Sequence, residues 1–274
     1  MCKCLTWLKE RFFGPSLPKV GQRTIDVPMD YLVQRTNRGS GPMVTINDML
    51  TMRRHDWPPP LGWEICDCVK VDPFTALQTF DFVDPANAGD GGQMIKVGDD
   101  GFVRAISTRD GGTPYLQYFV GRNNGGTGWI FFGTDAPTGK WRELVATLAK
   151  SNWENDKPPL GKAFTRYRRE QISMPVHEGS ASGVGVFDCI ISEHYDMETI
   201  NQSQAMERSY FAHGFGLVRW EAWGRTSDAP VGDLHLRYQH VAYSNPPDHG
   251  WYLDDIRTYT NFVACEPTPV PIMS

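Results

Sequence analysis

The sequence predicts a mainly β protein of the α+β class, folded as an antiparallel β-sandwich or a jelly-roll-like fold. Short runs in which polar and apolar residues alternate recur along the chain, and turn residues separate them. The 274 residues include 27 glycines and 20 prolines, with 9 tryptophans, 10 tyrosines and 14 phenylalanines. This composition is typical of a chain with many turns around a core rich in aromatic rings.

Residues 1–44 are predicted to form a helix followed by an extended arm. Leu5, Leu8 and Phe12 fall on one stripe of a helix. Prolines and glycines are frequent in the remainder of this segment, where they interrupt regular structure. We therefore expect an extended arm rather than a packed unit, with Thr24–Val27 as a candidate edge strand. Contact of this arm with a partner chain belongs to the alternative function given below.

Residues 45–274 are predicted to form one β-rich globular domain, and a boundary near residues 155–160 is the alternative. A second short N-terminal helix is expected close to Thr45, which is a suitable N-cap. A brief helix is expected after Pro73. Because these helices are short, most of the domain is expected to form strands.

The segment 139–153 is predicted to be one long amphipathic helix. Trp141, Leu144, Val145 and Leu148 recur at spacings of three and four residues. Such spacing places them on one face, so we expect this helix to pack against the sandwich.

Eleven other runs have the alternation or the β-branched and aromatic content of strands. They are 63–71, 93–97, 102–107, 115–120, 129–132, 164–172, 186–194, 206–212, 217–223, 234–243 and 251–263. Runs in the second half follow one another through turn residues, as in an antiparallel sheet.

Charge and hydropathy exclude several classes of function. The net charge of −5 argues against a nucleic-acid partner, because binding to phosphates needs an excess of basic side chains. No stretch approaches 18 uninterrupted apolar residues, so no membrane span is expected. The N-terminus lacks the apolar core of a signal peptide, which predicts a soluble protein that is cytoplasmic as synthesised.

No cofactor and no metal are expected. Cys66 and Cys68 form a C-x-C pair, which differs from the C-x-x-C spacing of structural zinc sites. Whether these two cysteines form a disulfide or contribute to a composite metal site stays open.

The segment Met206–Trp223 is predicted to be a β-hairpin that turns at Gly214. A turn at Gly214-Phe215 pairs Arg208 with Glu221 and Tyr210 with Arg219, whereas a turn one residue earlier opposes two arginines. Cross-strand charge pairing therefore favours the first register.

Two glutamates are the candidate catalytic residues. The alternation of the flanking strands places Glu193 and Glu207 among apolar neighbours. Burial raises the pKa of a carboxyl group, and a protonated carboxyl beside an ionised one is what hydrolysis of a glycosidic bond requires. The structural alternative is that each glutamate pairs with an arginine.

The surrounding rings and polar groups predict a saccharide-binding groove. The candidate substrate-binding residues are Trp220, Trp223, Tyr195, Tyr210, Arg219 and His194. Together these features predict a glycan-directed protein, either a glycoside hydrolase or a polysaccharide lyase, that acts on an oligo- or polysaccharide. The alternative is a noncatalytic carbohydrate-binding or assembly module that forms homo-oligomers through its N-terminal arm.

Overall fold

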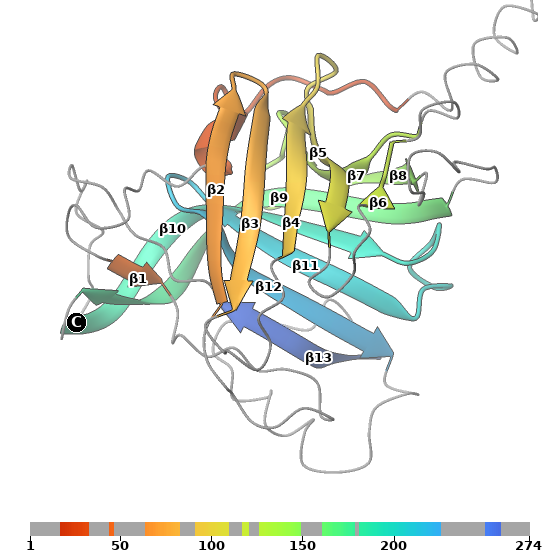
Figure 1. Ribbon diagram of the computed structural model, residues 1–274. Coiled ribbons are helices and arrows are strands. Elements are labelled where there is room, and N and C mark those ends of the chain that lie inside the picture. The colour runs from red at the N-terminus through yellow and green to blue at the C-terminus, as the bar shows by residue number, and fades with distance from the viewer. Residues whose placement is uncertain are drawn as a thin grey trace, which may run out of the picture.

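The protein is built from two antiparallel β-sheets that pack face to face, as the computed structural model shows (Figure 1). The structure describes residues 17–32, 44–46, 64–82, 91–109, 117–120, 126–148, 161–178, 181–225 and 250–258. Within these ranges the only helix is a short 3₁₀ helix, η1 (Pro28–Tyr31). The predicted β-rich class is confirmed.

Sheet A is the larger sheet, and its strands follow the order β1-β9-β10-β11-β12-β13, with β8 also paired to β9. The strands are β1 (Val44–Ile46), β8 (Arg142–Leu148), β9 (Gly161–Glu178), β10 (Ala181–Tyr195), β11 (Ala205–Ala212), β12 (Gly216–Arg225) and β13 (Trp251–Thr258).

Sheet B has the order β2-β3-β4-β5-β6, with β7 also paired to β5. The strands are β2 (Glu64–Asp72), β3 (Thr75–Phe82), β4 (Gly91–Val97), β5 (Phe102–Arg109), β6 (Gln117–Tyr118) and β7 (Trp129–Gly133). The chain then passes from β7 into β8 of sheet A.

Both sheets are meanders through most of the described chain, because strands adjacent in sequence are adjacent in the sheet. A jelly roll instead needs crossing Greek-key connections. Figure 1 shows the strands of sheet B running steeply across those of sheet A, so the sandwich is of the crossed kind.

The core lies where β7 meets the inner face of sheet A. Ile130 and Phe132 of β7 are fully buried together with Ile190 and Phe211 of sheet A. The rings of Phe132 and Phe211 lie 5.6 Å apart in a tilted arrangement. These contacts join the two sheets into one hydrophobic core.

The predicted long helix is wrong where the structure describes it, because residues 142–148 form strand β8. Leu144, Ala146 and Leu148 face the core, while Val145 between them is exposed. This run fits a two-residue period as well as a helical one, and pairing along β9 decides between them. Residues 149–153 lie outside the described part.

The other helices expected near the N-terminus differ similarly. The residues around Thr45 form β1, which pairs with the end of β9. The run after Pro73 forms β3, which pairs with β2 and β4. The helix expected around Leu5 falls outside the described residues, as does the strand expected at 234–243.

Residues 17–32, here called the strap, lie against the sandwich and do not extend away from it. Ile25, Met29, Tyr31 and Leu32 are buried in the main core. Figure 1 shows the strap in red across one end of the sandwich, ending at η1. This part of the predicted arm therefore belongs to the domain, while the division at residue 44 stays a prediction.

None of the described helical residues makes up a segment long and apolar enough to cross a membrane.

Candidate functional site

The hairpin formed by β11 and β12 has the predicted cross-strand pairs. Arg208 pairs with Glu221, and Tyr210 pairs with Arg219. The pairing shifts by one residue just after Tyr210. The turn that joins the two strands includes Gly214, which has a φ of +81° that glycine adopts readily. The sequence-derived register is confirmed.

The two candidate catalytic acids lie on neighbouring strands but on opposite faces of sheet A. Glu193 pairs with Arg208, whereas Glu207 pairs with His194. Directly opposed residues of an antiparallel pair share a face, and consecutive residues alternate between faces. The structure therefore does not bring the two carboxyl groups together, and this geometry gives no support to a mechanism that needs them as a pair.

Glu193 belongs instead to a row of alternating charges that crosses four strands. The row, here called the charge row, consists of Arg166 (β9), Glu193 (β10), Arg208 (β11) and Glu221 (β12), which pair directly in register. All four residues are buried. Arg219, also buried, places its Nε 2.9 Å from Glu221 Oε1.

Both carboxylate oxygens of Glu193 accept hydrogen bonds. Arg166 Nε donates to Oε2 over 2.5 Å, Arg208 Nη2 donates to Oε1 over 2.6 Å, and Tyr195 Oη donates to Oε2 over 2.8 Å. Burial acts to raise the pKa of Glu193, but the charges of Arg208 and Arg166 outweigh it and hold the pKa below its ordinary value. Glu193 is thus an ionised structural carboxylate, and it is unsuited to donating a proton.

Most of the expected saccharide-binding residues line this same buried face. Tyr195, Tyr210, Trp223 and Arg219 are all buried. Trp223 Nε1 donates to Glu221 Oε2 over 2.9 Å. Their polar groups contact residues of the charge row. These rings are therefore buried and do not form an open groove.

His194, Trp220 and Glu207 lie on the face that is directed toward sheet B. His194 is buried, and its Nε2 lies 2.6 Å from the carbonyl oxygen of Ile130. Because a carbonyl only accepts, this nitrogen carries the hydrogen. Burial lowers the pKa of His194 to about 4. Trp220 is half-buried and donates from Nε1 to exposed Glu207 over 3.3 Å.

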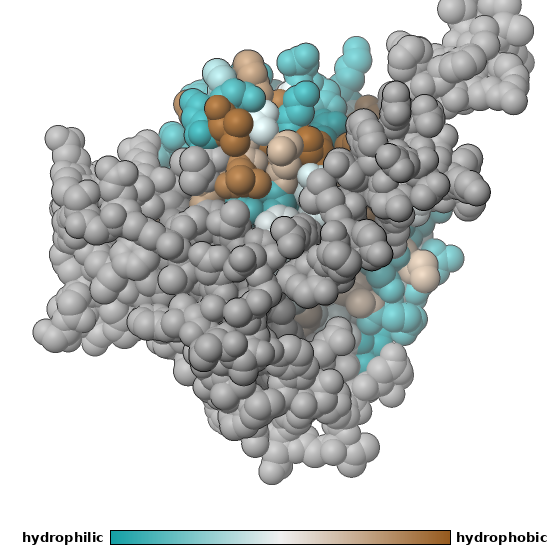
Figure 2. Space-filling view, in the orientation of Figure 1, coloured by the Kyte–Doolittle hydropathy of each residue, from teal (hydrophilic) through white to brown (hydrophobic). Residues whose placement is uncertain are grey.

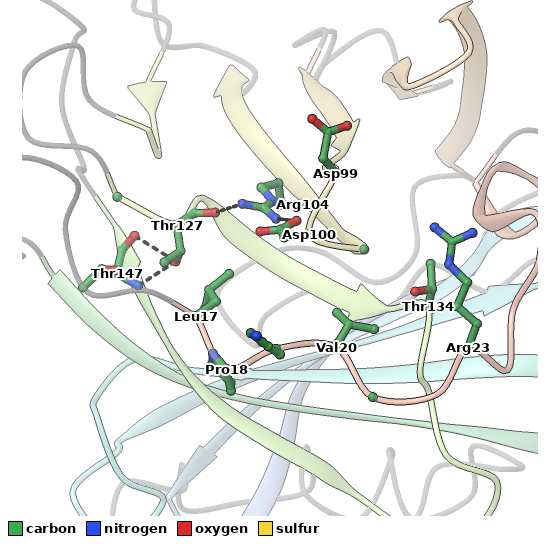
Figure 3. Close-up of a pocket in the computed structure, with 14 residues that line it drawn as sticks. Leu17, Pro18, Val20, Arg23, Asp99, Asp100, Arg104, Thr127, Thr134 and Thr147 are labelled. Carbon is green, nitrogen blue, oxygen red and sulfur yellow. Dashed lines mark hydrogen bonds and ion pairs between the residues drawn. The ribbon is translucent and has the colours of Figure 1, made fainter. Parts of the chain in front are cut away.

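A pocket that the sequence did not predict, lined by both polar and apolar residues, lies between the strap and one end of sheet B (Figure 3). Its volume is about 590 Å³. The strap forms one wall through residues 17–21 and Arg23, and the turn between β4 and β5 forms another. We call it the strap pocket.

The strap pocket combines hydroxyl, carboxylate and basic groups. Its charged and hydroxyl-bearing lining residues are Lys19, Arg23, Arg104, Asp99, Asp100, Thr127, Thr134 and Thr147. Arg104 is ion-paired with Asp100, and its Nη1 donates to the carbonyl oxygen of Thr127 over 3.1 Å. Figure 3 shows Arg104 and Asp100 facing one another, while Asp99 points away from the strap.

Glycine at position 101 is needed for this shape. Gly101 has a φ of +81°, and a Cβ there would lie 2.9 Å from Thr134 Oγ1 and 3.2 Å from a methyl group of Val20. The turn therefore approaches the strap more closely than any side chain at Gly101 would allow.

Hydrogen bonds hold the strap wall in place. Gly21 N donates to Asp135 Oδ2 over 2.7 Å, and Thr24 N donates to the carbonyl oxygen of Thr134 over 2.8 Å. Arg142 Nη2 donates to the carbonyl oxygen of Lys19 over 3.2 Å. The two partners of each bond are more than 100 residues apart in sequence, so no local pattern reveals these contacts. The only part of the pocket that can be recognised from the sequence is the Gly98–Gly101 turn.

The described residues contain no group of three or more His, Cys, Asp or Glu side chains placed to hold a metal ion. Cys68 and Cys189 are buried free thiols. Burial raises the pKa of Cys189, which makes it a poor nucleophile.

Comparison with known proteins finds no matching family model, no similar curated protein and no similar solved structure.

Proposed function

We propose that this protein is a noncatalytic carbohydrate-binding module and that its saccharide ligand occupies the strap pocket. The observation that carries the proposal is the mixture of acceptors and donors around this one cavity. Carboxylates accept hydrogen bonds, basic side chains donate them, and threonine hydroxyls do both. Sugar hydroxyl groups need both kinds of partner.

The size and the rigidity of the pocket support the same function. Its volume of about 590 Å³ is within the range of about 300–1,000 Å³ found for small-molecule sites. The clamped strap backbone reduces the entropy that is lost when a ligand binds. A preformed cavity of this kind, with both polar groups and apolar side chains in its lining, suits a saccharide, which carries hydroxyl groups and C–H faces.

Binding without catalysis is favoured over a glycosidase or lyase because of the two glutamates. Glu193 is ionised within the charge row, and Glu207 lies on the other face of the sheet. A retaining or inverting mechanism needs two carboxyl groups within roughly 5–10 Å on either side of one bond. The assembly role expected for the arm has less support in residues 17–32, since these pack on their own domain.

The test is a titration of the purified chain against a panel of neutral and acidic oligosaccharides, with binding followed by calorimetry. We expect at least one member to bind, and we expect Thr134→Val to weaken that binding about fivefold, the contribution of about one hydrogen bond, because the buried Oγ1 of Thr134 lines the pocket and has no partner among the described residues. Glu207→Gln is the matched control and should leave binding unchanged. The proposal fails if no saccharide binds, or if Glu207→Gln abolishes binding while Thr134→Val does not.

A further inference from the structure

We infer that the strap pocket selects saccharides that carry an anionic group, and that Lys19 and Arg23 of the strap bind this group. The inference rests on the proposed function and deepens it by naming the ligand class. Its basis is the distribution of charge, the unused hydrogen-bonding capacity of the pocket wall and the fixed backbone of the strap.

The charges of the pocket are unevenly compensated. The lining contains three basic residues and two acidic ones, in a chain whose net charge is −5. Arg104 and Asp100 neutralise each other in an ion pair. Among the described residues, Lys19 and Arg23 form no ion pair, and Asp99 points away from the strap that carries them (Figure 3). A positive charge therefore remains on the strap side of the pocket.

The wall of the pocket also has polar atoms that lack a hydrogen-bond partner among the described residues. These atoms are Thr134 Oγ1, Thr147 Oγ1 and Arg104 Nε, and the two threonines are only 1% and 6% exposed. Buried polar groups in folded proteins are nearly always satisfied by protein, water or ligand. Unused hydroxyls beside unused positive charge fit a ligand that carries both hydroxyl groups and an acid.

The strap holds both basic side chains at the pocket before a ligand arrives. The carbonyl oxygen of Lys19 accepts from Arg142 over 3.2 Å. Arg23 precedes Thr24, whose amide and hydroxyl groups donate to the carbonyl oxygens of Thr134 and Ala136 over 2.8 Å each. With the backbone anchored on both sides, only the side chains need to be ordered on binding.

A carboxylate of a uronic acid and a sulfate ester share the chemistry that this arrangement recognises. Arginine binds such planar or tetrahedral oxyanions through charge-assisted hydrogen bonds, and lysine adds a point charge. Binding should weaken as salt increases, because both side chains are exposed to solvent.

The test compares three oligosaccharides of equal length by calorimetry: a uronic acid oligomer, a sulfated oligomer and a neutral oligomer. We expect at least one anionic oligomer to bind tenfold or more tightly than the neutral one at low salt. The double variant Lys19→Met with Arg23→Gln should reduce this preference to less than threefold. Lys162→Met is the control, because Lys162 is an equally exposed lysine paired with Glu198 and outside the pocket lining.

The outcomes separate the inference from the proposed function. If the neutral oligomer binds as tightly as the anionic ones, the inference is wrong and the carbohydrate-binding function stands. If none of the three binds, both are wrong. If anionic binding survives the double variant, or is lost equally in Lys162→Met, the anionic group does not bind at the strap. Thermal melting of each variant verifies folding.

Discussion

At the scale of single residues, the charge row determines what Glu193 does. Its carboxylate is fully buried, and its partners are the guanidinium groups of Arg166 and Arg208. A buried ion pair adds little net stability compared with an apolar pair, but removing one partner leaves an uncompensated charge in the core. Glu193 is therefore a residue on which folding depends.

We expect Glu193→Gln to lower the free energy of unfolding by about 3–5 kcal/mol, the usual cost of breaking a buried ion pair. Urea denaturation measures this change. Glu198→Gln is the matched control, because Glu198 pairs with Lys162 at the surface and such pairs contribute about 0–1 kcal/mol. If the two variants lost equal free energy of unfolding, the buried charge row would contribute no more to stability than a surface ion pair.

Sequence reasoning grouped Glu193 with apolar neighbours and left two roles open for it, a catalytic carboxyl or the partner of an arginine. The alternation along β10 was enough to group Glu193 with Ile191 and Tyr195. Burial alone would raise its pKa, as predicted. The opposing contributions come first from Arg208 and then from Arg166, which lie on the two neighbouring strands, 15 and 27 positions away. The sequence offered Arg208 as a possible partner, but no local pattern reveals the pairing with Arg166.

At the scale of elements, the carboxylate of Asp188 is one of the groups of sheet A that attach the strap. Asp188 accepts hydrogen bonds from Arg169 Nε over 2.7 Å and from Tyr31 Oη over 2.7 Å. Burial acts to raise the pKa of Asp188, but Arg169 and Tyr31 outweigh it and hold the pKa below its usual value. Arg169 Nη1 also donates to the carbonyl oxygen of Thr24 over 3.0 Å. Asp188 thus fixes the arginine that binds the strap.

We expect Asp188→Asn to loosen the strap without unfolding the sandwich. Hydrogen bonds to charged groups contribute about 1.5–3 kcal/mol, so amide exchange at Ile25 and Leu32 should become at least about tenfold faster. Hydrogen exchange read by mass spectrometry checks this. Asp72→Asn, at the turn between β2 and β3, is the control and should leave exchange in the strap unchanged.

The elements that sequence reasoning found are those with an unambiguous period and a local partner. The β11–β12 hairpin is one, because its charge pairs are close in sequence. Strand β8 is the counterexample. Its apolar residues fit both a helical and a two-residue period, and the sequence does not show that this run pairs with β9. The strap was predicted to be part of an extended arm from its prolines and glycines, and the hydrogen-bond partners that hold it to the sandwich are too remote in sequence to be recognised.

At the scale of the whole molecule, buried titratable groups make stability depend on pH. The pKa of His194 is lowered from 6.5 to about 4 by burial. Between these values the unfolded chain binds a proton at this histidine and the folded chain does not, so the free energy of unfolding falls as the pH falls. Asp188 and Glu193 have lowered pKa values, so their contribution is lost at a still lower pH.

We expect the protein to lose about 3 kcal/mol of stability through His194 between about pH 6.5 and pH 4. In His194→Gln the free energy of unfolding should no longer fall with pH in this range, since glutamine does not bind a proton. Denaturant midpoints measured at half-unit pH intervals for both proteins give the two slopes. Parallel slopes would mean that the histidine protonates equally in the folded and unfolded chains.

The surface of sheet B is mixed in character. Figure 2 shows apolar residues among hydrophilic ones over the upper part of β2–β4. The most exposed large apolar side chains in this region are Val71, Phe74, Leu77 and Met94. The strap pocket at the end of the same sheet differs from this surface in its shape and in its cluster of charged side chains.

The charge row has a consequence for how sequences of this fold can diverge. Reversing or deleting one charge leaves its neighbour on the next strand with a like or missing partner, so no single substitution yields a tolerable intermediate. Exchanging Glu193 and Arg208 alone would keep their mutual attraction, but it would oppose two basic side chains at positions 166 and 193 and two acidic ones at positions 208 and 221. Sequence change along the row therefore requires the charges at all four positions to change together, and in chains that share this sheet these positions should vary jointly or not at all.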